Sequence, residues 1–138
     1  MILRFHRRKY VFRGYDPFSH SWVYGSLCEY ANKSCIYSKE HSEVCVVDPY
    51  SIGLCSKLYD FSDEPKLIFE GDIVKYDSSR LGYVFFNECA GCFCVRHKSK
   101  RGVVQSHSID IFRNCYPDVE VVGNMYENED MLRSEFYE

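Results

Sequence analysis

The densest group of residues that could carry chemistry is Cys89, Cys92 and Cys94, with His97 close behind. Thiolates at this spacing can bind zinc. A structural zinc site normally has a second cysteine pair, however, and the other five cysteines of this chain are scattered. On a strand, Cys92 and Cys94 would share one face and His97 would point to the other. The spacing therefore predicts no metal site and no cofactor, and the thiols are expected to pack as small apolar side chains.

Two carboxylates flank a glycine in Glu70-Gly71-Asp72, and such a pair could share a metal ion or a proton. The motif lacks a third ligand. We favour a structural interpretation, in which Gly71 supplies a positive φ between two strands and Asp72 accepts backbone N–H groups in the turn. A common nuclease signature joins Pro-Asp to a later Glu-x-Lys. The chain has Pro117-Asp118 and Glu120, but Val122 stands where the signature requires lysine. No catalytic residue is predicted, and the protein is not expected to be an enzyme.

The clearest binding signal is a basic stretch between two predicted strands. Its members are Arg96, Lys98, Lys100 and Arg101. A loop of this kind could lie along a phosphate backbone, and three nearby aromatic residues could stack on bases if they face outward. These are Tyr76, Tyr83 and Phe93. The other interpretation is a solvated hairpin tip whose charges keep the neighbouring strands from pairing at their edges. Nucleic-acid binding by the four cations is thus an alternative function.

Overall charge excludes a uniformly basic surface, because 17 Lys and Arg face 20 Asp and Glu, for a net charge of −3. The two ends differ in sign. Residues 1–13 are basic without an acidic residue, whereas residues 117–138 are strongly acidic. A basic arm could bind phosphates, but a solvated edge strand, or loose pairing with the acidic end, is the interpretation we favour.

Short runs of aromatic and β-branched residues, bounded by Gly, Asp, Asn and Ser, predict a mainly all-β fold. The expected strands are Ser21–Tyr30, Ser34–Ser38, Glu43–Val47, Lys66–Glu70, Asp72–Tyr76, Leu81–Asn87, Cys92–His97, Val103–Ser108 and Val119–Val122. The later strands predict antiparallel sheets with an SH3-like small barrel in the C-terminal half. One short C-terminal helix is expected, with Asn128 as its cap. The irregular stretch Ser51–Pro65 suggests a boundary between residues 1–60 and 61–138.

The cysteine count bears on the cellular compartment. Eight cysteines would suggest disulfides in a secreted protein. The first ten residues do not resemble a signal peptide, and no segment reaches the 18 apolar residues of a spanning helix. We therefore expect a cytoplasmic protein with free thiols.

Three stretches of the chain form recognisable motifs. They are Trp22-Val23-Tyr24-Gly25-Ser26-Leu27, Glu70-Gly71-Asp72-Ile73-Val74-Lys75-Tyr76 and Val121-Val122-Gly123-Asn124-Met125-Tyr126-Glu127-Asn128. In this order they resemble the YopX protein family of phages and prophages, over about residues 11–133. The resemblance implies a β-rich fold with a barrel-like C-terminal half and a phage-encoded intracellular protein. It implies no established activity.

One segment departs from the family pattern. Where the family has Tyr-Thr-Gly-Leu and Asp-Lys-Asn-Gly, this chain has Cys55-Ser56-Lys57-Leu58 and Asp60-Phe61-Ser62-Asp63. Two glycines are lost, which puts any special turn or ligand contact there in doubt.

Aromatic residues are the main compositional excess, at 17% of the chain. A chain of 138 residues cannot easily bury 12 Tyr, 10 Phe and 1 Trp in its own core, and exposed aromatic side chains are typical of interfaces. The leading expectation is therefore a non-enzymatic protein-interaction module that forms a homo-oligomer.

Overall fold

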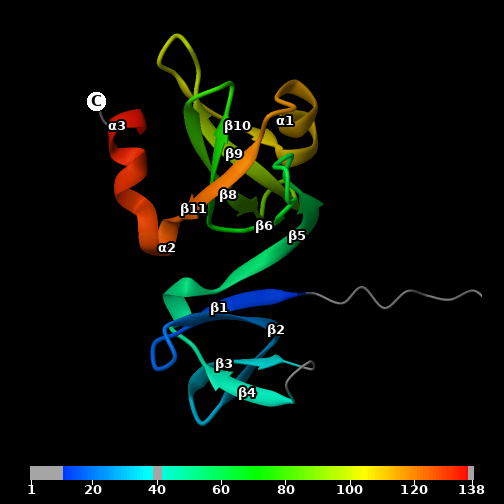
Figure 1. The fold of residues 1–138 in the computed structure, drawn as a ribbon, viewed down its shortest axis with the longest axis vertical. Coiled ribbons are helices and arrows are strands. Elements are labelled where there is room, and N and C mark those ends of the chain that lie inside the picture. The colour runs from blue at the N-terminus through cyan, green and yellow to red at the C-terminus, as the bar shows by residue number, and fades with distance from the viewer. Residues whose placement is uncertain (1–10, 39–41, 137–138) are drawn as a thin grey trace, which may run out of the picture. The chain divides into compact units, whose positions relative to one another are not determined.

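The structure is a computed structural model that describes residues 11–38 and 42–136 (Figure 1). The basic residues before Val11 lie outside the described part, so the interpretation of that end stays a prediction. The chain divides into two compact units, Met1–Leu54 and Cys55–Glu138, each of which is treated by itself below.

The fold is mainly antiparallel β, as predicted. The strands are β1 (Phe12–Asp16), β2 (Ser21–Tyr30), β3 (Lys33–Ser38), β4 (Glu43–Val46), β5 (Gly53–Tyr59), β6 (Leu67–Phe69), β7 (Asp72–Tyr76), β8 (Arg80–Asn87), β9 (Cys92–Lys98), β10 (Val104–Ser108) and β11 (Glu120–Asn124). The helical segments are η1 (Pro49–Ser51), α1 (Ile109–Cys115), α2 (Met125–Asn128), η2 (Glu129–Leu132) and α3 (Arg133–Phe136). None of these described helices is long and apolar enough to cross a membrane.

The first unit is an antiparallel sheet in the order β4-β3-β2-β1, to which the start of β5 adds beside β1. Its buried apolar residues include Cys35, Ile36 and Val47. Two glycines allow close approach: a Cβ at Gly14 would lie 2.7 Å from the Val47 side chain, and one at Gly25 would lie 1.9 Å from the Tyr37 carbonyl oxygen. The close packing of these strands therefore requires glycine at both positions.

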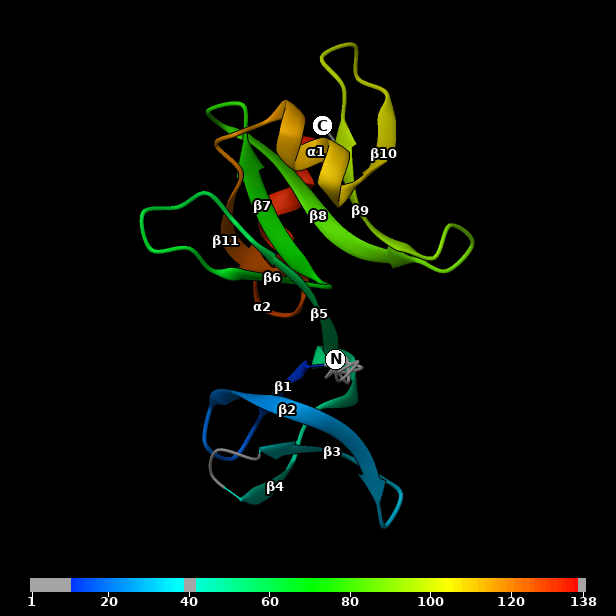
Figure 2. The same cartoon turned by 90° about the vertical axis from the view of Figure 1, so that its right-hand side faces the viewer.

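The second unit is built on a five-stranded sheet in the order β10-β9-β8-β7-β11, with β6 and the end of β5 as a separate pair. One face of the sheet carries the core, in which Tyr76, Val84 and Val95 pack against Phe112 of α1. Figure 2 shows α1 in front of this sheet and the C-terminal helical residues behind it. The sheet is barrel-like rather than a closed barrel, because β10 and β11 are its two ends.

The C-terminal helix is confirmed, but it begins earlier than predicted and consists of three short segments. The cap is Asn124, whose side chain accepts a hydrogen bond from the Glu127 N–H at 2.8 Å. The expected cap, Asn128, stands at the start of η2, but its side chain forms no cap bond there. It accepts a hydrogen bond from the Asn124 N–H at 3.1 Å and lies against Gly123. Asparagine is a good cap at either position. The helical segments begin after Asn124 because β11 ends there.

Candidate functional site

A groove lies on the face of the second unit that α1 does not cover. Its volume is about 860 Å³. The lining residues are Tyr83, Arg96, Val104, Met125, Glu129, Leu132, Arg133 and Phe136. They come from β8, β9 and β10 on one wall and from α2, η2 and α3 on the other. The short helical segments shape the groove because they cover only part of the sheet.

The groove combines aromatic rings with cations. Tyr83 and Arg96 are cross-strand partners on β8 and β9, so both side chains stand on the same face. The rings of Tyr83 and Phe136 pack against one another, with centroids 5.8 Å apart, and so join the two walls of the groove. Neither Arg96 nor Arg133 forms an ion pair within the part of the chain that the structure describes. The groove can therefore offer apolar contact and a charge-assisted hydrogen bond to one incoming group.

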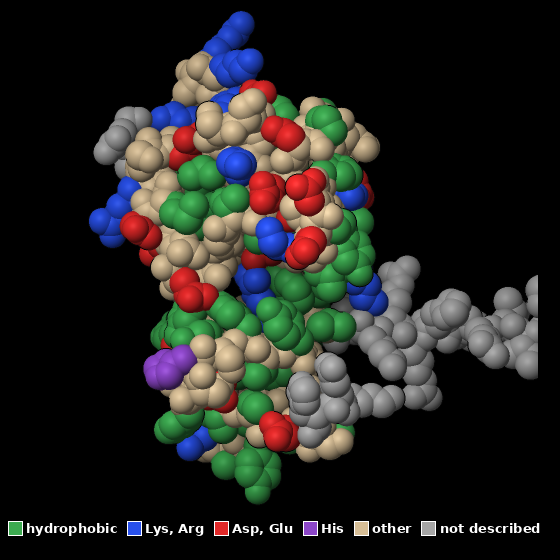
Figure 3. Space-filling view, viewed as in Figure 1, with side chains coloured by type: hydrophobic (Ala, Val, Ile, Leu, Met, Phe, Trp, Pro, Cys, Tyr) green, Lys and Arg blue, Asp and Glu red, His purple; other side chains and the backbone are tan. Residues whose placement is uncertain are grey.

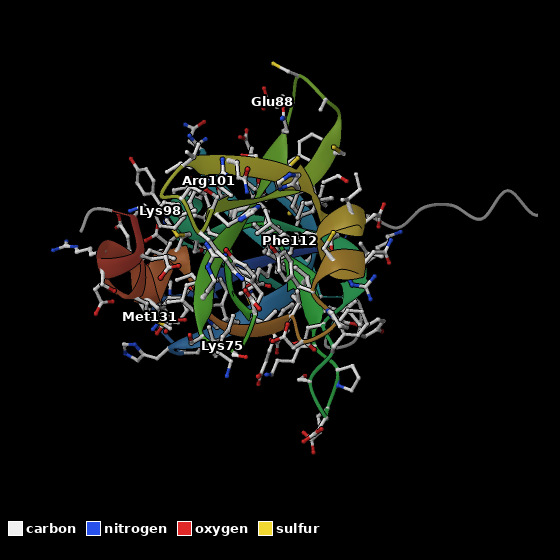
Figure 4. The ribbon with its side chains drawn as sticks, turned by 90° about the horizontal axis from the view of Figure 1, so that it is seen from above. Lys75, Glu88, Lys98, Arg101, Phe112 and Met131 are labelled. Atoms are coloured by element: carbon white, nitrogen blue, oxygen red, sulfur yellow. The ribbon has the colours of Figure 1, made fainter. Side chains whose placement is uncertain are left out.

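The four predicted cations do not share one place. Arg96 lines the groove, whereas Lys100 and Arg101 lie exposed at the β9–β10 turn. Figure 4 labels Lys98 and Arg101 on this hairpin. The Lys98 carbonyl accepts a hydrogen bond from the Arg80 guanidinium, which ties the hairpin to β8.

Only one of the three candidate stacking residues remains available. Tyr76 is fully buried, and burial raises its pKa to about 12. Phe93 packs edge-on against Phe86 at 5.2 Å and also contacts the core. Tyr83 alone lines the groove beside Arg96.

The first unit carries two similar turns that the sequence patterns did not single out. Each turn is Asp-Pro-aromatic: Asp16-Pro17-Phe18 and Asp48-Pro49-Tyr50. The aspartate Oδ1 accepts the N–H of the aromatic residue in both, at 2.9 Å for Phe18 and 3.0 Å for Tyr50. We call this pair the aromatic turns. An aspartate before a proline is a turn signal, so the repeat was visible in the sequence.

The aromatic turns lie side by side and hold their rings outward. The Asp48 N–H donates to the Tyr15 carbonyl at 2.9 Å, and the Tyr15 N–H donates to Ser51 Oγ at 2.7 Å. Phe18 is 89% exposed and Tyr50 is 91% exposed, the highest values among the large apolar side chains of the described residues. The hydrogen bond from the Phe18 N–H lowers the pKa of Asp16, so this carboxylate is charged at neutral pH.

Glu70-Gly71-Asp72 has the structural role that we predicted. Gly71 has φ of 91° and connects β6 to β7. Asp72 is buried, and its Oδ2 accepts the Phe69 N–H at 2.7 Å. The Gly71 carbonyl also accepts the N–H of Met125, which fixes the start of α2. The motif thus positions one wall of the groove.

The cysteine cluster is organised as the strand pattern predicted. The Sγ atoms of Cys92 and Cys94 lie 3.8 Å apart on one face of β9, while His97 packs on Tyr76 and Phe112 on the other. Within residues 11–38 and 42–136, no three His, Cys, Asp or Glu side chains gather as metal ligands. Burial raises the pKa of Cys94, which disfavours a reactive thiolate.

His97 is buried and contacts a second histidine. Its Nε2 lies 2.8 Å from Nδ1 of His107. Burial, followed by the charges of His107 and Arg80, lowers the pKa of His97 to about 4. His97 is therefore neutral at physiological pH and serves the core rather than acid–base chemistry.

These features define a mainly antiparallel β protein that has a groove and two exposed aromatic turns. A search of the curated proteins gives no match. The family model described as YopX protein matches residues 11–133, nearly the whole chain. The chain therefore belongs to the YopX family, as the sequence motifs predicted.

Proposed function

We propose that this protein is a non-enzymatic interaction module that associates with further copies of itself through the aromatic turns. The YopX motifs support an origin in a phage or prophage and a place in the host cytoplasm. The single observation that carries the proposal is the nearly complete exposure of Phe18 and Tyr50.

The distribution of apolar side chains supports an interface on the first unit. Of the fourteen exposed large apolar residues in the described chain, eight belong to this unit, although it is the smaller one. They are Phe18, Tyr24, Leu27, Tyr30, Tyr37, Val44, Val46 and Tyr50. Figure 3 shows hydrophobic side chains gathered over the strands of the first unit and charged ones over the second. Apolar groups clustered in this way are typical of protein-binding surfaces.

The aromatic turns are also rigid, which favours binding. Proline fixes one φ in each turn, and each aspartate holds the backbone N–H of the ring-bearing residue. A turn whose backbone is already fixed loses little conformational entropy when a partner covers its ring. Aromatic side chains of this kind are the usual hot spots of protein interfaces.

The test is a double variant, Phe18→Ser with Tyr50→Ser, studied by sedimentation velocity over a range of concentrations. We expect self-association to weaken at least about tenfold, since each hot-spot ring contributes about 1 kcal/mol or more. The fold should be unchanged, because both rings are exposed.

Tyr59→Ser is the matched control. Tyr59 is 52% exposed on β5 in the second unit, outside both the aromatic turns and the lining of the groove. It should associate as the unmodified protein does. Equal association constants for the double variant and for this control would refute the proposed contact surface.

Nucleic-acid binding is the second candidate, and the exposure of Lys100 and Arg101 at the hairpin tip favours it. Glu129 in the groove opposes it, because a carboxylate repels phosphates. A labelled single-stranded oligonucleotide tests it: binding should fall steeply with salt and with Lys98, Lys100 and Arg101 changed to Ala. The interaction-module proposal expects no such binding.

A further inference from the structure

We propose that the groove of the second unit receives the aromatic turns of another copy of this chain. This inference rests on the proposed self-association and names the surface that the rings contact. The two surfaces belong to different units, so the contact is heterologous, with one face of each copy bound to a different face of the next.

Apolar complementarity is the first argument. The most exposed rings of the first unit are those of Phe18 and Tyr50. The groove offers Tyr83, Met125 and Phe136 as contacts for them. Aromatic rings pair well edge-on or tilted, and a methionine thioether adapts to a ring edge. A volume of about 860 Å³ lies within the usual range for ligand pockets.

Charge complementarity is the second argument. Each ring that would enter the groove follows an aspartate by two positions, and Asp16 is held in its charged form. The groove carries Arg96 and Arg133, whose guanidinium groups have no acidic partner among the described side chains. Asp16 Oδ1 accepts the N–H groups of Phe18 and Ser19, and because a carboxylate has about four lone-pair sites it can also accept from arginine. An acidic turn that ends in a ring therefore matches both kinds of group in the groove.

The same comparison disfavours other occupants. A nucleic acid would place phosphates beside Glu129, whereas a turn brings only one or two carboxylates and can keep them near the arginines. An isologous contact between two sets of aromatic turns would bring aspartates of equal charge together. A turn-to-groove contact avoids both penalties.

The experiment uses two full-length variants that each lose one side of the contact. The turn variant combines Phe18→Ser and Tyr50→Ser. The groove variant combines Arg96→Glu and Arg133→Glu, which keeps the exposed positions charged. Sedimentation velocity at equal concentrations should show each variant alone with the mass of one chain, 16.3 kDa.

Mixing the two variants gives the decisive result. The groove variant still has intact aromatic turns and the turn variant still has an intact groove, so one contact can form. We expect a 1:1 complex with the mass of two chains and no larger species, because both remaining surfaces are disabled. In the unmodified protein, by comparison, both surfaces are intact, so each copy can bind a further copy and larger oligomers can form.

Arg101→Glu serves as the matched control for charge. It is exposed at the hairpin tip, outside the groove lining, and should leave association unchanged. Circular dichroism spectra and melting temperatures equal to those of the unmodified protein should confirm that every variant is folded.

Three outcomes overturn the inference. If the groove variant associates as well as the unmodified protein, the rings bind elsewhere and the proposed function still stands. If each variant is monomeric but the mixture stays monomeric, the two surfaces do not contact one another. If the unmodified protein is monomeric at all concentrations, the proposed function fails together with this inference.

Discussion

Asp60 shows how one residue can hold several segments of the second unit. It is 2% exposed, and its carboxylate accepts the N–H of Lys66 at 2.8 Å and of Val121 at 2.9 Å. The Ser62 hydroxyl donates to it as well, at 2.7 Å. Burial alone would raise the pKa of Asp60, but these hydrogen bonds lower it below its ordinary value. The carboxylate therefore fixes the 60–66 loop to β11.

Replacing Asp60 with Ala should destabilise the protein by roughly 2 to 4 kcal/mol, because buried N–H groups lose a charged acceptor. Chemical denaturation measures this change. Asp63→Ala, an exposed change in the same loop, should stay within about 0.5 kcal/mol of the unmodified protein. A difference between the two variants of less than 1 kcal/mol would contradict the role given to Asp60.

His97 should make stability depend on pH in the mildly acidic range. Its pKa is about 4 in the folded protein against an ordinary value of 6.5, so the unfolded chain takes up the proton first. Stability is thus retained above about pH 6.5 and falls as the pH drops toward about 4, by roughly 1 to 3 kcal/mol. His97→Gln should flatten this part of the profile. Parallel profiles for the two proteins would show that His97 does not contribute.

At the scale of elements, the alternating strands were predictable and the irregular ones were not. β2 and β7 match their predicted bounds because their apolar runs end at clear turn signals. The sequence predicts an irregular stretch where β5 lies, and the strand is in fact irregular: Lys57 has φ of 64°, and the pairing with β6 shifts between Cys55 and Tyr59. A bulge of this kind disturbs the period on which the prediction depends.

Helix α1 was missed for a different reason. Its residues Ile109, Ile111 and Phe112 favour strands by local propensity. Ile109 and Phe112 are nevertheless both buried against the core, as the spacing of one helical turn allows. Tertiary packing therefore overrides local preference in this segment.

Gly25 is the element-scale position at which a single methyl group should matter most. Gly25→Ala would bring the new Cβ within 1.9 Å of the Tyr37 carbonyl, so β2 and β3 must separate. We expect a loss of about 2 kcal/mol or more in the free energy of unfolding, measured by denaturant titration. An unchanged midpoint would show that the two strands are not packed this closely. Ser26→Ala, at the next and exposed position, is the control.

For the whole molecule, the sequence predicts which residue types would form an interface better than it predicts where in the fold they lie. The excess of aromatic residues indicated exposed rings, and Arg96 was a predicted binding residue that lines the groove. The groove itself could not be foreseen, because its walls come from residues 83 and 136, which are distant in sequence. The aromatic turns are not among the predicted sites, because a turn signal such as Asp-Pro says nothing of how far the next side chain is exposed.

The central claim is that the unmodified protein associates with itself, and sedimentation equilibrium tests it most directly. The account predicts a weight-average mass that starts near 16.3 kDa in dilute solution and rises with protein concentration. A mass that stays at 16.3 kDa over the whole concentration range would contradict it.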